Sequence, residues 1–138
     1  MPVRSQQEAR DSKRPIRILL ADDSETIRTV AGDALVAAGY DVVAAEDGED
    51  AWTKLCVDGA EVPFDLVVSD VEMPGLDGLA LTERIRASER FAGLPVILVT
   101  SLASEEDREL GRESGASAYL VKNPVDQTEL LAQIRELV

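Results

Sequence analysis

The amino-acid sequence predicts an α/β domain with a doubly wound, five-stranded parallel sheet and five helices. From Ile16 onward, runs of strand character alternate with helical patterns in five successive β-then-α units. The strand runs are rich in Val, Ile and Leu, as expected for parallel strands that are buried on both faces. Alternation alone does not fix the strand order, and we expect 2-1-3-4-5, a common order for small sheets of this kind.

The first two units have clear boundaries. Ile16–Ala21 predicts a strand, and Ser24 is the expected N-cap of the following helix, which Gly39 ends. Val42–Ala45 predicts the second strand, and Asp47 with the glycine after it opens the second helix. The apolar faces of these helices are assigned to the core, with the other leucines and valines: Ile27, Val30, Ala31, Ala34, Leu35 and Ala38, then Ala51, Trp52, Leu55 and Cys56.

The last three units continue the alternation. Phe64–Ser69 predicts the third strand, and Asp77 is expected to cap a helix that ends near Ser88. Pro95–Val99 predicts the fourth strand, because proline is tolerated at the first residue of a strand. Ser104 with Asp107 predicts the start of the fourth helix, and Gly115 separates this helix from the fifth strand, Ala118–Val121. Asp126 with Glu129 is expected to open a last helix that buries Leu130, Ile134 and Leu137.

Length and composition indicate one domain. The chain has 138 residues and is 45% hydrophobic, which is enough for one core and too short for two ordinary domains. Residues 16–138 carry the alternating pattern. Residues 1–15 are polar and charged without apolar periodicity, so we interpret them as a flexible arm or a linker.

The charge balance and the missing residue types exclude several classes of function. Lys and Arg total 14 against 27 Asp and Glu, and a net charge of -13 disfavours direct binding of nucleic acid. The sequence has no histidine, which removes His-based metal sites and Ser-His catalysis. The single Cys56 fits a reducing cytosol. No apolar run approaches the ~20 residues of a membrane helix, and the N-terminus lacks a secretory signal, so we expect a cytoplasmic protein without membrane contacts.

Polar residues stand where the predicted strands end. Asp22 and Asp23 follow the first strand, Asp70 the third, Thr100 the fourth and Lys122 the fifth. Parallel strands end at one edge of the sheet, where ligands bind in open α/β folds. The sequence therefore predicts one pocket with three carboxylates, a hydroxyl and an amine. This set suits Mg²⁺ and a phosphoryl group, with Asp70 as the nucleophile.

Each of these residues also has a purely structural interpretation. Asp22 and Asp23 could complement a helix dipole, Asp70 could cap a turn, and a lysine at a strand end is usually only solvated. Thr100 and Tyr119 both fit strand propensity without any further role. The shared edge of the sheet, and not any single residue, favours a site.

Four segments resemble the receiver domain of two-component response regulators. They are LLADDSETIR, VVSDVEMPGLDG, VILVTS and AYLVK, and their order and spacing match over about Ile16 to Val138. The resemblance implies a flavodoxin-like fold and a chemotaxis-regulator-like phosphorylation switch. The stretch LVKNPVDQTELLAQIREL is also similar to receivers fused to chemotaxis-type histidine kinases. The chain is thus interpreted as a stand-alone regulator or as a receiver excised from such a kinase.

The resemblance also implies roles for individual residues. Asp70 matches the aspartate that accepts a phosphoryl group from a histidine kinase or a phosphotransfer domain, and such a receiver is a phosphoacceptor and not an enzyme with turnover. The downstream protein target is expected on the face made by the fourth helix, fifth strand and fifth helix. The other matched positions are the Mg²⁺ ligand Asp23, Asp22 acting through water, the backbone carbonyl of Glu72, the switch residues Thr100 and Tyr119, and the phosphate-binding Lys122.

One departure concerns the residue after Lys122. The family usually has Lys-Pro at this point, often with a cis peptide bond, whereas this chain has Asn123 before Pro124. A cis bond without proline costs about 2.5–4 kcal/mol. The sequence therefore leaves open both the geometry of this peptide bond and the placement of Lys122.

Two other functions compete with the receiver interpretation. A Mg²⁺-dependent aspartyl-phosphate hydrolase also uses an Asp nucleophile, but its second Asp would fall at Glu72, and the chain has no room for a cap domain. A flavodoxin-like FMN protein would place phosphate after the first strand, where Asp22 and Asp23 would repel it.

Overall fold

A computed structural model of the chain describes residues 15–101, 104–123 and 125–138. The predicted N-terminal arm, apart from Pro15, lies outside the described residues, as does Leu102, which the sequence places beside the site. Within the described ranges, no helix combines the length and the apolar character needed to span a membrane.

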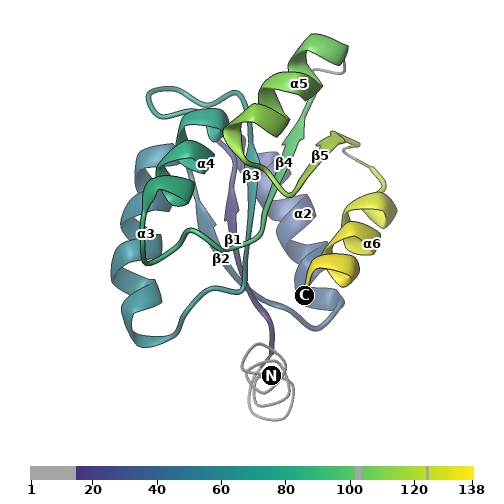
Figure 1. Cartoon of the computed structure of the whole chain (residues 1–138). Helices are drawn as coiled ribbons and strands as arrows, with labels where there is room; N and C mark the ends of the chain where they lie inside the picture. Colours follow the sequence, from purple (N-terminus) through teal and green to yellow (C-terminus); the bar gives the residue numbers. More distant parts are fainter. Residues whose placement is uncertain (1–14, 102–103, 124) are drawn as a thin grey trace.

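The sheet has the predicted architecture (Figure 1). All its strand pairs are parallel and its order is β2-β1-β3-β4-β5, which confirms the expected order 2-1-3-4-5. The boundaries of the first four strands differ from the prediction by one or two residues, and at the site Asp70 and Thr100 are the last residues of their strands and do not follow them. The strands are β1 (Arg17–Ala21), β2 (Asp41–Ala45), β3 (Leu66–Asp70), β4 (Val96–Thr100) and β5 (Ala118–Val121).

Helices cover both faces of the sheet, as a doubly wound fold requires (Figure 1). The structure describes five, with α3, α4 and α5 on one face and α2 and α6 on the other. Their bounds are α2 (Glu25–Ala37), α3 (Gly48–Glu61), α4 (Gly78–Ala87), α5 (Glu105–Ser114) and α6 (Thr128–Leu137).

Side-chain caps start four helices at the predicted residues. Ser24 accepts a hydrogen bond from the Ile27 amide, and Asp47, Asp77 and Ser104 accept equivalent bonds at the starts of α3, α4 and α5. These bonds satisfy amides that have no partner within the helix. The last helix differs from the prediction. Its N-cap is Gln127 without a side-chain hydrogen bond, and Asp126 accepts the Thr128 amide just before the first turn.

The core has two layers, one on each face of the sheet, because successive strand residues point to opposite faces. In β1, Leu19 joins the layer under α3 and α4, whereas Ile18 and Leu20 join the layer under α2 and α6. The helices contribute the large buried side chains Leu55, Leu81 and Ile85 to the first layer, and Leu35, Leu130 and Ile134 to the second.

The assignment of all valines and leucines to the core is wrong. A helix that packs on one face of a sheet buries only a narrow stripe, so the flanking positions face solvent. In α2, Ala31 and Leu35 are buried while Val30 is 39% exposed. Trp52 is only partly buried and makes an edge-to-face contact with Phe91. Among the described residues, the other exposed large apolar side chains are Val36, Val57, Val62, Leu110, Val121 and Val125.

Arg86 ties α4 to two loops, and no sequence signal predicts this. Its guanidinium donates hydrogen bonds to the carbonyl oxygens of Leu94 at 2.7 Å, Gly115 at 2.8 Å and Ala92 at 3.1 Å. These carbonyls precede β4 and β5, so the side chain holds the entry to both strands against the C-terminal end of α4.

We expect Arg86→Gln to lower the free energy of unfolding by about 1–3 kcal/mol, because the shorter amide cannot serve three carbonyls at once. Urea unfolding would measure the change. Arg112→Gln is the matched control, since Arg112 is exposed and its ion pair joins only the neighbouring Glu109. Equal effects of the two substitutions would contradict the proposed tie.

Candidate functional site

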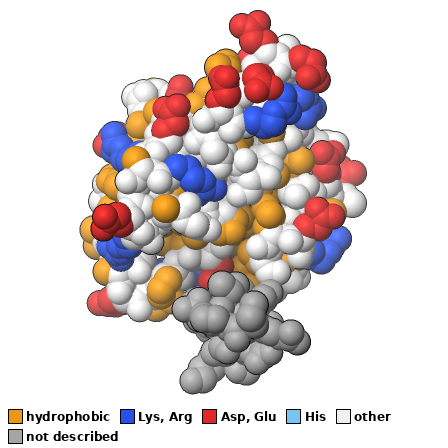
Figure 2. All heavy atoms as spheres, in the orientation of Figure 1, with side chains coloured by type: hydrophobic (Ala, Val, Ile, Leu, Met, Phe, Trp, Pro, Cys, Tyr) orange, Lys and Arg blue, Asp and Glu red, His pale blue; other side chains and the backbone are white. Residues whose placement is uncertain are grey.

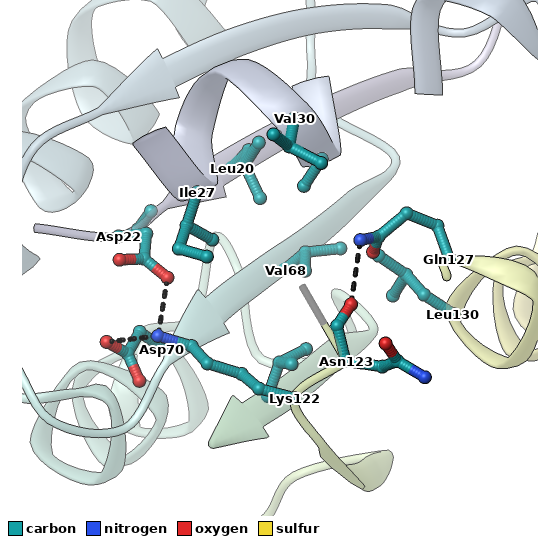
Figure 3. Close-up of a pocket in the computed structure, with 13 residues that line it drawn as sticks. Leu20, Asp22, Ile27, Val30, Val68, Asp70, Lys122, Asn123, Gln127 and Leu130 are labelled. Carbon is teal, nitrogen blue, oxygen red and sulfur yellow. Dashed lines mark hydrogen bonds and ion pairs between the residues drawn. The ribbon is translucent and has the colours of Figure 1, made fainter. Parts of the chain in front are cut away.

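The predicted site residues meet at the carboxyl edge of the sheet. Asp22 follows β1, Asp70 and Thr100 end β3 and β4, and Lys122 follows β5. Asp22, Asp70 and Thr100 are buried, with exposed fractions of 3%, 4% and 0%. Figure 3 shows Lys122 reaching toward both aspartates across the end of the sheet. The fold thus confirms the spatial gathering that the strand ends predict.

Lys122 bridges the two buried carboxylates. Its Nζ atom lies 2.9 Å from Asp22 Oδ2 and 3.1 Å from Asp70 Oδ2. Burial alone lowers the pKa of Lys122, but the hydrogen bonds to Asp22 and Asp70 outweigh it, so the pKa is raised overall. The ammonium therefore stays charged and partly offsets the negative charge of the pair.

The surroundings of Asp70 disfavour its charged form and raise its pKa. Burial is the largest cause that raises its pKa, the hydrogen bond from Lys122 opposes this, and the charge of Asp22 raises the pKa further. The Glu72 amide also donates to Asp70 Oδ1 at 3.3 Å. Burial thus contributes more to the raised pKa of Asp70 than the repulsion from Asp22 does.

The carboxylates fit a divalent cation. Asp22, Asp23 and Asp70 each offer an oxygen atom, and these atoms lie within 4.8 Å of one another. Three carboxylates and the single ammonium of Lys122 leave a formal charge of −3 + 1 = −2, which a divalent ion would neutralise. Asp23 is exposed, so the cluster opens to solvent, as suits Mg²⁺ with its retained waters.

Hydrogen bonds fix the chain at Asp22. Its amide donates to the Ala45 carbonyl at 3.1 Å, and its Oδ1 accepts the Ser24 amide at 2.9 Å. Arg28 donates to the Asp22 carbonyl oxygen at 2.7 Å. Sequence reasoning missed Arg28, because an arginine one turn into a helix carries no signal that it will point back to the preceding loop.

The loop after β3 presses against the backbone of Asp70. The Gly78 amide donates to the Val71 carbonyl at 2.9 Å. A Cβ atom on Gly78 would lie 2.2 Å from the Asp70 carbonyl oxygen, which leaves room for glycine alone. Glu72 extends from this loop, where its side chain accepts a hydrogen bond from Ser101 Oγ at 3.3 Å. The close approach at Gly78 keeps the loop, and with it Glu72, beside the site.

Thr100 and Tyr119 are in contact on the other side of the site. The two hydroxyl groups are hydrogen-bonded. The Arg108 guanidinium lies over the partly buried Tyr119 ring, with its Cζ atom 5.7 Å from the ring centroid. Burial, and then the charge of Asp107, raise the pKa of the Tyr119 phenol. Thr100 is thus placed between the sheet edge and an aromatic side chain that reaches α5.

The peptide bond after Lys122 is trans, since the described residues include no cis bond. The following turn is built by Asn123, whose Oδ1 accepts the amides of Val125 at 3.2 Å and Asp126 at 3.1 Å. Gln127 donates from its side chain to the Asn123 carbonyl at 2.9 Å. Side-chain hydrogen bonds therefore hold the segment that follows Lys122, and the lysine still reaches both aspartates.

A largely apolar cavity lies beside the bridged carboxylates, between α2 and α6 (Figure 3). Its labelled apolar lining is Leu20, Ile27, Val30, Val68 and Leu130. Sequence reasoning assigned these residues to the core and did not foresee their position beside the site. The apolar walls limit solvation of Asp22 and Asp70, which is the burial that raises the pKa of Asp70.

A family model for the response regulator receiver domain matches residues 18–135. The chain belongs to the receiver-domain family of response regulators. This receiver domain is 42% identical over 118 residues to the gliding motility regulatory protein of Myxococcus xanthus, and the match covers 86% of this chain and 14% of that protein. The chain spans 48% of another curated relative, the transcriptional regulator RpaA of Synechocystis.

Solved structures show the same fold. The chemotaxis protein CheY4 of Vibrio cholerae superposes with a TM-score of 0.78 at 31% identity, and the match covers 90% of this chain and 99% of that one. TrrA of Thermotoga maritima, solved in complex with Mg²⁺ and BeF, gives a TM-score of 0.76 at 31% identity, with 89% and 99% covered. TrrA thus binds Mg²⁺, and the present chain has three carboxylates that could hold such an ion.

The raised pKa of Asp70 links the stability of the metal-free receiver domain to pH. A carboxyl whose pKa is higher in the folded than in the unfolded protein binds its proton more tightly in the folded state. Protonation of such a group therefore stabilises the folded protein. As pH rises from the ordinary value of 3.8 through the raised folded pKa, ionisation of Asp70 should lower the free energy of unfolding.

Asp70→Asn should therefore be more stable than wild type at neutral pH without metal, and the difference should vanish as pH falls below the ordinary pKa. Urea unfolding across pH in a chelator would measure this. Asp33→Asn, on the exposed side of α2, is the control. An Asp70→Asn protein with the wild-type dependence on pH would refute the assignment of the shift to Asp70.

Proposed function

We propose that this receiver domain accepts a phosphoryl group on Asp70 in a Mg²⁺-dependent reaction and that phosphorylation changes its partner-binding surface. The donor is a histidine kinase or a phosphotransfer domain, and the protein works in the cytoplasm. The observation that carries the proposal is the bridge of Lys122 between buried Asp22 and Asp70, with Asp23 within reach of both.

The geometry supports an in-line transfer to Asp70. An Asp70 oxygen attacks phosphorus, the new O–P bond forms, and the P–N bond of a phosphohistidine breaks with its electron pair going to the imidazole. Lys122 contacts Oδ2 before the reaction, and its ammonium can pass to a phosphoryl oxygen as charge accumulates there. The Glu72 amide holds Oδ1 and so limits rotation of the carboxylate.

Asp22, Asp23 and Asp70 are the residues that would hold Mg²⁺, and the family resemblance adds the backbone carbonyl of Glu72. When bound, the ion supplies positive charge that offsets the phosphoryl oxygens. The excess of two negative formal charges in the cluster supports this assignment.

The readout is proposed to run through Thr100 and Tyr119. Thr100 would move toward the phosphoryl group and so break its hydrogen bond with the Tyr119 hydroxyl. The face made by α5, β5 and α6 would then change and bind a downstream protein and not nucleic acid, since the chain carries a net charge of -13. Two discrete side-chain arrangements can bias such a surface without large backbone motion.

Hydrolysis of a small phosphomonoester remains the competing function. In such an enzyme a second acid, two residues after the nucleophile, delivers protons to the leaving group. Here Glu72 stands at that position, and its side chain is engaged by Ser101. We therefore propose a stoichiometric phosphoacceptor without turnover of external substrates.

Acetyl phosphate with Mg²⁺ should add one base-labile phosphoryl group per chain, because Asp70 combines the contact with Lys122 with a place in the three-carboxylate cluster and matches the family's phosphoacceptor. Mass spectrometry of the intact protein would measure it. Asp70→Asn should abolish the label, and omission of Mg²⁺ should suppress it.

Asp77→Asn is the matched control, since asparagine also caps helices and should leave labelling intact. Catalytic release of phosphate from a phosphomonoester would instead support the hydrolase. Undiminished labelling of Asp70→Asn would exclude Asp70 as the acceptor.

Mg²⁺ should raise the melting temperature of the wild type, and at 100 times its Kd the gain corresponds to about 2.7 kcal/mol. Asp23→Asn should stabilise the metal-free protein by relieving repulsion, and should greatly reduce the gain from Mg²⁺. Thermal unfolding with and without Mg²⁺ would measure both effects, with the exposed Asp33→Asn as control. If Asp23→Asn kept the full gain, Asp23 would not be a ligand.

A further inference from the structure

Helix α5 is attached to the sheet in an unusual way. Its buried residues are Gly111 and Ser114, so within the described structure it buries no side chain larger than serine. Each of the other four described helices buries at least one leucine. Figure 2 shows acidic side chains gathered over the α5 end of the molecule, in keeping with the Glu and Asp residues of its first turn.

The contact that replaces a buried apolar side chain comes from the sheet. Tyr119 on β5 packs its ring against the backbone of α5 at Gly111. A Cβ atom at position 111 would lie 2.4 Å from Tyr119 Cδ2, 3.0 Å from Cε2 and 3.4 Å from Cγ, and its three nearest atoms all belong to this ring. An alanine at position 111 would therefore exclude the ring from its present place.

The rest of the helix gives no reason for glycine at this position. Glycine inside a helix is less favourable than alanine, and Gly111 lies in the interior of α5, without a turn or a helix end that would need it. Gly32 in α2 provides a contrast, because a Cβ atom there would meet only Leu20 Cδ2, at an ordinary 3.8 Å. Space for the Tyr119 ring is the requirement that the structure shows at Gly111.

The same ring is joined to the candidate phosphorylation site. Its hydroxyl is hydrogen-bonded to Thr100, which is buried at the end of β4. Thr100 is also the residue whose carbonyl accepts the Lys122 amide, at 2.7 Å. Tyr119 thus touches the site at one end and the bare backbone of α5 at the other.

We propose that Gly111 is the positioning residue of this switch: its missing side chain forms the seat that allows Tyr119 to lie between Thr100 and α5. Departure of the ring from the seat would remove the contact of Tyr119 with the backbone of α5 at Gly111. The link to phosphorylation rests on the proposed function, whereas the steric seat does not.

A double-mutant cycle tests the seat without any ligand. Gly111→Ala, Tyr119→Ala and the double variant would be compared by urea unfolding, with Gly32→Ala as the matched helix-interior control. Helix propensity predicts a higher unfolding midpoint for Gly32→Ala. Gly111→Ala should lower the midpoint when Tyr119 is present and raise it, as in the control, when residue 119 is alanine. An equal gain in both backgrounds would overturn the proposal.

NMR of the tyrosine rings tests the coupling, with Tyr40 as the internal reference. In wild type, Mg²⁺ with beryllofluoride should shift the Tyr119 ring and the amides of α5. Gly111→Ala should still bind beryllofluoride, seen by fluorine NMR, while the Tyr119 ring has already left residue 111 and no longer responds. A ring that keeps its contact with residue 111 and its wild-type response would overturn the proposal. Failure of wild type to bind beryllofluoride would refute the phosphorylation function. The double-mutant cycle would still show whether Gly111 makes room for the Tyr119 ring.

Discussion

The site depends on one constraint, which is that two carboxylates are buried side by side and share a single ammonium. Lys122 lies within 3.1 Å of both Asp22 and Asp70, and apolar walls between α2 and α6 limit their access to water. One cation cannot neutralise this cluster once Asp23 is counted. Burial is the main cause of the raised pKa of Asp70, and the charge of Asp22 adds to it.

The parallel sheet makes this arrangement possible. Residues from β1, β3, β4 and β5 are far apart in sequence, and only a shared strand direction brings their ends to one edge. Local hydrogen bonds then set the details, such as the Arg28 bond to the Asp22 carbonyl and the turn built by Asn123. Lys122 reaches both aspartates although a trans peptide bond and Asn123, and not a proline, follow it.

The sequence predicted features that follow from local chemistry. Periodicity and caps such as Ser24 and Asp77 located the helices to within a few residues, and the strand ends located Asp70 and Lys122. Features that depend on the packed chain were missed: the three carbonyls served by Arg86, the exposure of Val30, and the fit of Tyr119 against α5. Each is decided by residues distant in sequence, which a local pattern does not report.

The absence of large buried side chains from α5, within the described structure, has a consequence for cooperativity. A helix that buries only Gly111 and Ser114 has little buried apolar surface, so it can open while the sheet stays intact, and such an opening is sub-global. Amide protons of α5 would then exchange with solvent at a lower free energy than those of β1 and β3, whose side chains are almost entirely buried. The molecule therefore combines a rigid half that holds the acidic cluster with a helix that is only weakly part of the folding unit.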